Sequence, residues 1–555
     1  MRLPVIPANG AEKRRVLCGE KGIFEIGERG EDARISAAHL DLSRLPLLVP
    51  EKPRTSLAGI GGEVLQFFSN GECVCMLTRD GDTYRALLYD AATHELWSLD
   101  LPTPREGAFL YAHAWRGERL YLPAFSAIID LSARVLLPTD KPLVGGESKV
   151  GYDEALATKN RHTVCFLEAD FSHFPVGEYV TVRYRRLDEE WWRVLLVQIQ
   201  SVNAEAGEIT LQGEGAPDLL HSCPGTISVG YDLPLLNGIF ADHERLYGFS
   251  RNRIYISAKG EEALCFTPVA QHTPDEAAVV IEVDAELTGG CMYGDKPVFF
   301  TDGAVLRVVE DSDLGIRVST TPTVGVTPRA AVSPAVIGNR ICYFSRHGLA
   351  LFDGKEGRVV RSGIRAPKGG AAVADGRFYS FFASGAGGQS LYAYDAAGDL
   401  LYDLGGSRQL GVAHALGGVL IATEYTGEET RLMLFCERDA LPYPISQMVS
   451  DGVLTVLENA PECTRLVLGD VRGDTDICSP VEITVDARIE AGATLTVSLY
   501  LDDEQIPHRI HTLTGTGART VHRLPCLPRR CEAYRLELCG EGDFCVFTVS
   551  TVERG

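Results

Sequence analysis

The sequence lacks the long apolar segments that a membrane-spanning helix needs. No window approaches the roughly 18 uncharged apolar residues of such a helix. Near the N-terminus, Pro4 and Pro7 interrupt the stretch where a secretion signal is continuously apolar, and the basic residues 13–15 follow that stretch instead of preceding it. N-glycosylation sequons are also missing. We therefore expect a chain with no membrane anchor that is made and folded in a cytosol.

Positive charge is in short supply as well. The chain has 53 Lys and Arg against 75 Asp and Glu, which gives a formal net charge of −22. Proteins that wrap nucleic acid depend on Lys and Arg to release counterions from phosphates, and proteins that dock on anionic lipid depend on the same residues. The charge therefore argues against both classes of partner as a held ligand.

Zinc and redox motifs are absent, although the chain has 15 cysteines. None of the cysteines forms a CxxC pair, and none has a His at zinc-binding spacing. Several, such as Cys75 and Cys342, lie among apolar strand residues, where a reduced thiol packs as a small hydrophobic group. We expect reduced, buried thiols and no metal cofactor, with an undetected metal site or disulfide as the alternative.

Glycine and proline are abundant, with 57 and 28 residues spread along the whole chain, which indicates many turns between short strands. A strand–turn–strand pattern recurs, and 87–92 (LLYDAA) matches 392–397 (YAYDAA) with Asp at the turn. Copies centred at 89, 129, 254, 299, 352, 394 and 435 are 40, 125, 45, 53, 42 and 41 residues apart. Five of these six spacings are close to the 40–50 or so residues of a four-stranded propeller blade. The pattern predicts a six- or seven-bladed β-propeller that one inserted domain interrupts.

The insert and the C-terminal region have strand patterns of their own. Alternation at 179–184, followed by further short strands, predicts a small inserted β-barrel or sandwich. The adjacent Trp191 and Trp192 point to opposite faces of a strand, so one of them is expected at a surface contact, and both are interface candidates. From 479 onward, alternating strands such as 544–549 predict a C-terminal β-sandwich of the jelly-roll kind.

The predicted fold is therefore all-β, since helical periodicity is almost absent. Its parts, in chain order, are an N-terminal arm at 1–55 that could close the propeller, blades at 56–147, the inserted domain at 148–232, further blades at 233–448, a linker at 449–478, and the C-terminal sandwich at 479–555.

Catalytic motifs are missing too: the sequence has no GxxxxGK[ST], no strand–GxGxxG–helix unit, no HExxH and no GxSxG. Paired carboxylates at a propeller centre would suit glycoside hydrolysis. Glu154, Asp170, Asp242 and Asp302 could contribute to such a pair, but nothing in the sequence brings two of them together. We expect no catalytic residue, no enzyme activity and no cofactor.

Two clusters have the residue types of a metal site. Asp470, Asp474 and Asp476 could offer oxygen ligands to Ca²⁺, but an Arg inside the run and the lack of a downstream Glu favour an acidic linker instead. His508 and His511 follow an acidic run at 502–504, yet residues three apart on a strand face opposite sides. A solvated hairpin tip is therefore the favoured interpretation of the second cluster.

Three stretches resemble a known family. The segment 45–54 (LPLLVPEKPR) is similar to a signature near the N-terminus of virion proteins from prophages of gut Firmicutes, with Val49 and Glu51 departing from the Ser and Arg of that signature. The run 237–260, continued at 287–300, resembles propeller strands of those proteins and of podophage tail nozzle or DNA-stabilisation proteins, and 531–544 resembles the end of phage tail β-sandwich domains.

This resemblance implies a structural protein of a phage tail, acting as a nozzle, hub or tube component in the virion. It implies a homo-oligomer, expected as a hexameric ring, in contact with other tail, portal or adaptor proteins and assembled in the host cytoplasm. DNA would pass through as cargo, which suits an acidic channel wall that repels phosphate. Two alternatives stay open: a glycan- or receptor-binding propeller adhesin, and a propeller glycoside hydrolase.

Overall fold

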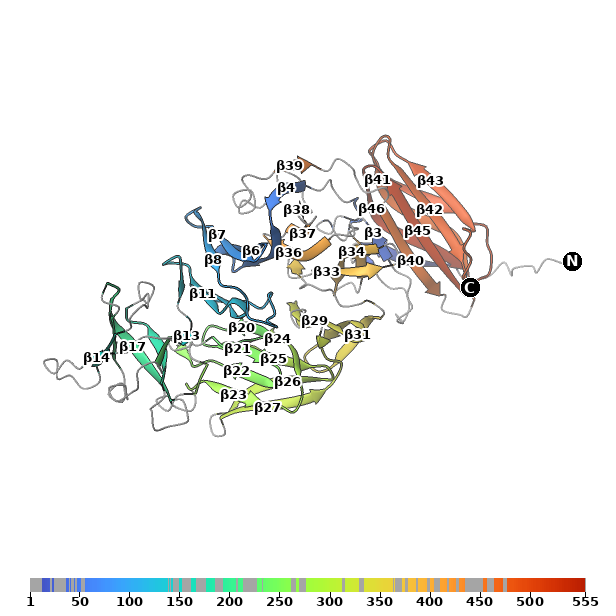
Figure 1. The fold of residues 1–555 in the computed structure, drawn as a ribbon. Helices are drawn as coiled ribbons and strands as arrows, with labels where there is room; N and C mark the ends of the chain where they lie inside the picture. The colour runs from blue at the N-terminus through green and yellow to red at the C-terminus, as the bar shows by residue number, and fades with distance from the viewer. Residues whose placement is uncertain are drawn as a thin grey trace. The chain divides into compact units, whose positions relative to one another are not determined.

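The computed structural model covers the 555-residue chain (Figure 1). It describes residues 12–554 except for 20–21, 24–35, 39, 41–43, 45–46, 51–54, 138, 140, 143–148, 152–160, 166–175, 185–192, 206–207, 213–226, 232, 261–265, 269–275, 312–314, 329–333, 363, 365–371, 375–377, 386–387, 397–399, 404–409, 417–418, 426–428, 435–452, 457–463 and 473–476.

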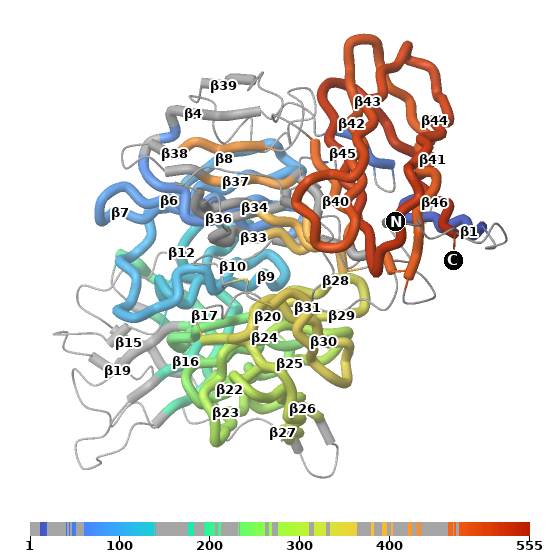
Figure 2. The backbone as a smooth tube through the Cα atoms, turned by 90° about the vertical axis from the view of Figure 1, so that its right-hand side faces the viewer, coloured from blue at the N-terminus to red at the C-terminus, as the bar shows by residue number. Residues whose placement is uncertain are grey.

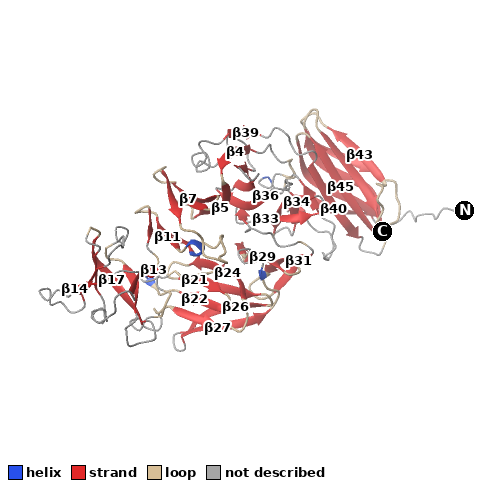
Figure 3. Cartoon of the chain, viewed as in Figure 1, coloured by secondary structure: helices blue, strands red, loops and turns tan. Residues whose placement is uncertain are grey.

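The described residues are almost all in strands and turns, so the all-β prediction is confirmed (Figure 3). They include no α-helix, and the one helical element with bounds is a single 3₁₀ turn, η2 (Pro123–Phe125). Within the part of the chain that can be described, no helix is long and apolar enough to cross a membrane. The chain divides into two compact units, which are Gly61–Val359 with Ala366–Gly370, and Met1–Ile60 with Val360–Arg365 and Ala371–Gly555.

Four-stranded antiparallel sheets are the recurring element of the first unit. Each is a meander in which neighbouring strands are consecutive in the sequence. The first sheet contains β5 (Glu63–Ser69), β6 (Cys73–Asp80), β7 (Thr83–Asp90) and β8 (Leu96–Leu101), and the second contains β9 (Ala114–Arg116), β10 (Arg119–Leu122), β11 (Ala127–Asp130) and β12 (Val135–Leu137). The third contains β20 (Gly238–Ala241), β21 (Leu246–Ser250), β22 (Arg253–Ile256) and β23 (Val279–Glu282), and the fourth contains β24 (Leu287–Tyr293), β25 (Lys296–Thr301), β26 (Ala304–Asp311) and β27 (Gly315–Pro322). The fifth contains β28 (Ala335–Ile337), β29 (Arg340–Ser345), β30 (Gly348–Phe352) and β31 (Gly357–Ser362).

Aspartates at the predicted turns explain why these strands reverse where they do. At the end of β7, Asp90 Oδ1 accepts hydrogen bonds from the backbone N–H groups of Ala92 and Thr93, at 2.8 and 3.2 Å. After β30, Asp353 Oδ1 accepts from Lys355 and Glu356, both at 2.9 Å. A short carboxylate that bonds the backbone two and three residues ahead fixes a tight turn. The Asp of the sequence repeat is therefore a turn former.

Successive sheets of the first unit pack face to face through shared apolar cores. Residues of β5–β8 and β9–β12 form one core, residues of β20–β23 and β24–β27 form another, and β24–β27 shares a third with β28–β31. The first strands of neighbouring sheets also lie next to one another, with β9 beside β20, β20 beside β24, and β24 beside β28 (Figure 2). Sheets that adjoin along their first strands and stack through their faces have the arrangement of propeller blades.

The insert between the second and third of these sheets is a seven-stranded antiparallel sheet with the order β13-β19-β16-β17-β18-β15-β14. Its strands are β13 (Lys141–Pro142), β14 (Lys149–Gly151), β15 (Arg161–Cys165), β16 (Tyr179–Tyr184), β17 (Arg193–Asn203), β18 (Glu208–Gln212) and β19 (Ile227–Gly230). Val182, Val197 and Ile209 of this sheet share an apolar core with Ile128 of β11 and Leu246 of β21. The insert therefore packs against the sheets that precede and follow it.

The second unit contains two further blade-like sheets. One runs β32 (Ala372–Ala374), β33 (Phe378–Gly385), β34 (Gly388–Asp395) and β35 (Leu400–Asp403), and the other runs β36 (Leu410–Leu416), β37 (Val419–Tyr425), β38 (Glu429–Leu434), β4 (Thr55–Gly61) and β39 (Val453–Val456). The fourth strand of the latter sheet, β4, comes from the N-terminal end of the chain. The last blade-like sheet is thus completed by a strand that lies several hundred residues before the other strands of that sheet.

Two facing sheets form the C-terminal part of the second unit. One has the order β2 (Gly22–Ile23), β1 (Glu12–Gly19), β46 (Phe544–Arg554), β41 (Ser479–Ile489) and β44 (Arg519–Pro525). The other has β3 (Ser36–Ala38), β40 (Thr464–Arg472), β45 (Ala533–Glu541), β42 (Thr494–Leu501) and β43 (Arg509–Thr514), and β3 joins it to β35.

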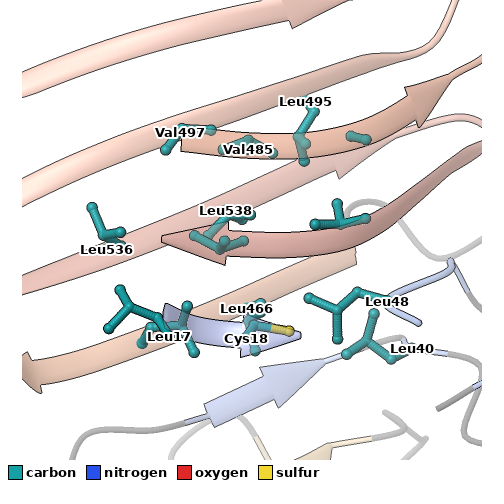
Figure 4. Packing of buried hydrophobic residues seen from close by; sticks show 14 of the residues in the cluster. Leu17, Cys18, Leu40, Leu48, Leu466, Val485, Leu495, Val497, Leu536 and Leu538 are labelled. Carbon is teal, nitrogen blue, oxygen red and sulfur yellow. The ribbon is translucent and has the colours of Figure 1, made fainter. Parts of the chain in front are cut away.

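The core of these two sheets comes from strict alternation along their strands. In β45, Tyr534, Leu536 and Leu538 are buried while the residues between them are less covered. They pack with residues of the opposite sheet such as Val485, and with Leu17 of β1, in one apolar cluster (Figure 4). Because side chains alternate between the faces of a strand, this pattern buries one face of each sheet and leaves the other to solvent.

The boundaries expected on either side of the propeller need correction. The expected linker at 449–478 contains β39 and β40, and β40 pairs along its length with β45, so the facing sheets begin before 479. The expected N-terminal arm supplies β1 to one of the facing sheets and β3 to the other, and β4, which joins the last blade-like sheet, begins at the final residue of that arm. Both segments are short and flanked by turn-rich sequence, and only their distant partners make them strands.

Candidate interaction surface

The two clusters that have the residue types of a metal site are described only in part. Asp470 lies in β40, and its side chain, like Asp474 and Asp476, is outside what the structure describes. Over the described residues, no group of three or more His, Cys, Asp or Glu side chains could hold a metal ion. His508 and His511 have separate environments, because His508 Nε2 donates to the Leu527 carbonyl at 3.1 Å while burial lowers the pKa of His511.

Of the four carboxylates considered for hydrolysis, the structure describes two, and both have structural partners. Asp242 Oδ1 accepts hydrogen bonds from the backbone N–H groups of Glu244 and Arg245, at 2.7 and 2.6 Å, and its Oδ2 accepts from the Tyr247 hydroxyl at 2.9 Å. Asp302 Oδ2 pairs with Arg346 at 2.5 Å. Asp242 is a turn former of the same kind as Asp90. Glu154 and Asp170 lie outside the described residues, as do Trp191 and Trp192.

The feature of the described surface with the clearest capacity for binding is at one end of the C-terminal facing sheets. It joins the turn between β42 and β43 to the segment between β44 and β45. We call it the tip surface and define it as Ile506, Arg509, Ile510, Leu527 and Arg530. Its three apolar side chains are 79%, 55% and 65% exposed for Ile506, Ile510 and Leu527.

Specific contacts hold the two segments of the tip surface together. His508 Nε2 donates to the Leu527 carbonyl at 3.1 Å, and Arg529 pairs with Glu504 at 2.8 Å. At the base of the turn, Asp502 has a positive φ of 51°, and its Oδ1 accepts hydrogen bonds from the backbone N–H groups of Glu532 and Ala533, at 2.7 and 3.2 Å. Ile506 is therefore displayed on a turn that is held to the segment that carries Leu527.

The stretch of sequence that contains these apolar residues is rich in arginine, although the acidic run 502–504 directly precedes it. Between 505 and 535 the sequence has six arginines, one glutamate and no lysine or aspartate, so this segment carries +5 while the rest of the chain carries −27. Three of these arginines have partners: Arg519 bonds Asp486, Arg529 bonds Glu504, and Arg535 lies over the Tyr500 ring. Arg509, Arg523 and Arg530 are exposed, and no ion pair holds them among the residues described.

Exposed apolar side chains beside unpaired arginines are the composition of a protein-binding surface. Interfaces are enriched in Arg and in apolar anchors, and a lone apolar side chain on a surface needs no partner, whereas a cluster does. Our sequence interpretation treated 502–511 as a solvated hairpin tip and missed this surface. The available signal was the local charge: six arginines and one glutamate in a chain that is otherwise strongly acidic.

Cysteine chemistry in the same facing sheets differs from the expectation in one respect. Nine described cysteines are free, and eight of them are buried, as expected for reduced thiols that pack as small hydrophobic groups. Cys539 of β45, however, is disulfide-bonded. At Cys539 the alternative of a disulfide therefore applies in place of the favoured reduced thiol.

Comparison with known proteins adds little. The chain matches no protein-family model and no curated protein sequence. Among solved structures it is similar to the β-propeller domain of the Trilobed protease from Pyrococcus furiosus, with 12% identity over 73% of this chain and 98% of that chain and a TM-score of 0.31. The Cps50 (Swd1) β-propeller domain of Myceliophteria thermophila is 10% identical over 68% of this chain and 98% of that chain, with a TM-score of 0.28. The acylaminoacyl peptidase of Pyrococcus horikoshii is 9% identical over 75% of this chain and 59% of that chain, with a TM-score of 0.29. Similarities this weak carry no argument about function.

Proposed function

We propose that this chain is a structural subunit that assembles with copies of itself, and that it serves as a nozzle, hub or tube component of a bacteriophage tail. The observation that carries the assembly is the tip surface. It combines three exposed apolar side chains with arginines that have no acidic partner among the described residues. The place in a phage tail rests on the sequence resemblance alone.

The proposed occupant of the tip surface is a second copy of the chain. A segment with charge +5 is complementary in net charge to the remainder of another copy, which carries −27. Opposite potentials steer association and select the partner, while the apolar anchors supply affinity once water is displaced. A head-to-tail contact of this kind, in which one surface binds a different surface of the next copy, closes into a ring when the rotation allows.

The proposed body of the subunit is a seven-bladed propeller. Seven blade-like sheets are present among the described residues, five in the first unit and two in the second. Pairing of the N-terminal strand β4 into the last of them is the way in which propellers close. In the proposed ring, the acidic remainder of each copy lines a channel through which DNA passes without being held.

Charge reversal tests the assembly. The variant carrying Arg509→Glu and Arg530→Glu should be a monomer at concentrations at which the native chain forms a complex of several copies, because each substitution replaces attraction with repulsion. Sedimentation velocity at low and high salt measures this, and high salt should also weaken the native complex. The matched control is Arg317→Glu, an exposed arginine of β27 whose reversal should leave the complex intact.

A native chain that stays monomeric at every concentration and salt would contradict the proposal, as would a complex that survives the double reversal. Glycan binding is the main competing function. The tip surface and its two segments, 504–511 and 525–530, contain no aromatic residue on which a sugar ring could stack. Binding of a host-wall polysaccharide by the monomer, abolished by the same double reversal, would favour the adhesin instead.

A further inference from the structure

A pair of buried cysteines lies at one end of the C-terminal facing sheets. Cys478 directly precedes β41 of one sheet, and Cys531 is two residues before β45 of the other. The two residues face each other across an isolated antiparallel bridge and exchange both backbone hydrogen bonds, at 2.8 and 2.9 Å. Their Sγ atoms are 3.6 Å apart.

We propose that Cys478 and Cys531 are a thiol–disulfide site that forms a disulfide when the folded chain meets an oxidising disulfide such as glutathione disulfide. Residues that exchange both backbone hydrogen bonds across an antiparallel pair have Cα atoms about 5.5 Å apart, which is inside the range that a disulfide spans. The sulfurs have to approach by roughly 1.5 Å, which small rotations about χ1 supply. The backbone is thus already placed for the bond.

Ordinary packing of cysteine as a small hydrophobic group does not account for this placement. Cys526 and Cys545 are buried in the same facing sheets, yet Cys526 Sγ contacts the Leu524 carbonyl, and no sulfur of another described cysteine lies against either of them. Among the described cysteines outside disulfides, Cys478 and Cys531 are the one pair whose sulfurs are in contact. Cys539 on the neighbouring β45 is already disulfide-bonded, so the same sheet carries an oxidised cysteine.

The reaction balances with glutathione disulfide as the oxidant. One protein thiolate attacks a sulfur of glutathione disulfide, which forms a mixed disulfide and releases one glutathione thiolate. The second protein thiolate then attacks the protein sulfur of the mixed disulfide, and the second glutathione leaves. The two protons lost by the cysteines are taken up by the two glutathione thiolates. Two electrons pass from the cysteine pair to glutathione disulfide.

Burial makes the reaction of this cysteine pair with the oxidant slow as long as the folded protein keeps both thiols covered. Cys478 and Cys531 are 2% and 4% exposed. The hydrogen bond with Cys478 and burial raise the pKa of the Cys531 thiol, so little thiolate is present at neutral pH. The exposed residues 527–530 directly precede Cys531, and opening of this segment gives the oxidant access. Oxidation should therefore proceed faster as pH rises.

The bond would fasten the two facing sheets to each other. It closes a loop of 53 residues that contains β41 to β44 and also the tip surface. A crosslink across a loop of this length removes much of the freedom of the unfolded chain, so the oxidised form should resist unfolding more strongly. In a chain synthesised in a reducing compartment, the disulfide would thus form and crosslink the two sheets after the chain enters an oxidising compartment.

Peptide mapping of the full-length chain tests the site directly. After incubation with glutathione disulfide at pH 8, alkylation of remaining thiols and digestion with trypsin, Cys478 is in the peptide 473–488, Cys531 in 531–535 and Cys526 in 524–529. We expect a crosslinked pair of 473–488 with 531–535, while 524–529 is recovered alkylated. The oxidised chain should also melt several degrees higher than the reduced chain.

Cys531→Ala should abolish both the crosslinked peptide and the gain in melting temperature, whereas the matched control Cys526→Ala should keep both. The mapping of the native chain stands even where a variant fails to fold. Recovery of both 473–488 and 531–535 in alkylated form, as mixed disulfides with glutathione, or joined to other peptides would overturn the assignment.

Discussion

At the scale of single residues, His113 shows how burial can outweigh a hydrogen bond in setting a charge state. It directly precedes β9, its ring lies against Phe68 with centroids 4.0 Å apart, and its Nδ1 donates to the Tyr111 carbonyl at 3.2 Å. Burial lowers the pKa of His113 from 6.5 to about 4. The imidazole is therefore neutral in the folded protein over a range in which it would be protonated in water.

This shift predicts that the protein loses stability as pH falls from 6.5 to about 4. In that range the unfolded chain binds a proton at His113 and the folded chain does not, so the free energy of unfolding decreases toward acid, by about 3 kcal/mol at most. His113→Phe should remove this part of the pH dependence. Urea unfolding at pH 7 and pH 5 measures it, and an unchanged difference between the two pH values in the variant would contradict the assignment.

Residue patterns predicted local geometry well and surface display poorly. The Asp of the repeated strand–turn–strand unit forms the expected turns at Asp90 and Asp353, because an Asx turn depends only on residues two and three positions ahead. The tip surface was not predicted. Whether Ile506 or Leu527 is exposed depends on the packing of strands that lie far apart in sequence. The alternation of apolar and polar residues along one strand contains no information about this packing.

At the scale of elements, β1 is the N-terminal strand that completes a sheet of the C-terminal region. It pairs antiparallel with β46, so that Arg15 lies opposite Thr551. Arg15 Nε is 3.2 Å from Glu553 Oε1, and the Tyr534 hydroxyl donates to the same oxygen at 2.6 Å. The side chains of Arg15 and Glu553 are only 12% and 6% exposed. This network attaches the first described strand of the chain to the last.

Arg15→Leu should destabilise the facing sheets by about 3 kcal/mol, because it leaves the Glu553 carboxylate buried without its cation. Adding Glu553→Gln to that variant should recover part of the loss. The matched control is Arg14→Leu, since Arg14 is exposed on the same strand and should matter by less than about 1 kcal/mol. Chemical unfolding measures all three, and equal effects of the two arginine substitutions would contradict this account of the network.

Element prediction failed where strands are short and their partners remote. β40 lies in the stretch expected to be a linker, β1 and β3 lie in the expected N-terminal arm, and β4 begins at the end of that arm. β4 pairs with β39, and β3 with β35 and β40, at separations of several hundred residues. Sequence periodicity within a few residues carries no information about such pairs, whereas the consecutive hairpins of the blade-like sheets were predictable from local alternation.

At the scale of the whole molecule, charge is distributed unevenly along the chain. The segment 505–535 carries +5 and the remainder −27. The shortage of positive charge therefore applies to most of the chain but not to the segment 505–535. The net charge of the chain argues against phosphate binding. The uneven distribution of charge along the sequence is what suggests association between copies.

The most direct test of the proposed assembly is an image of the purified full-length chain. Single-particle electron microscopy at low salt should show closed rings of several copies, with the C-terminal facing sheets at the contacts between neighbours. Their arginine-rich ends should face the acidic surface of the next copy. Particles that contain a single copy at every protein concentration, or rings whose contacts leave Ile506, Arg509 and Leu527 exposed, would contradict the account.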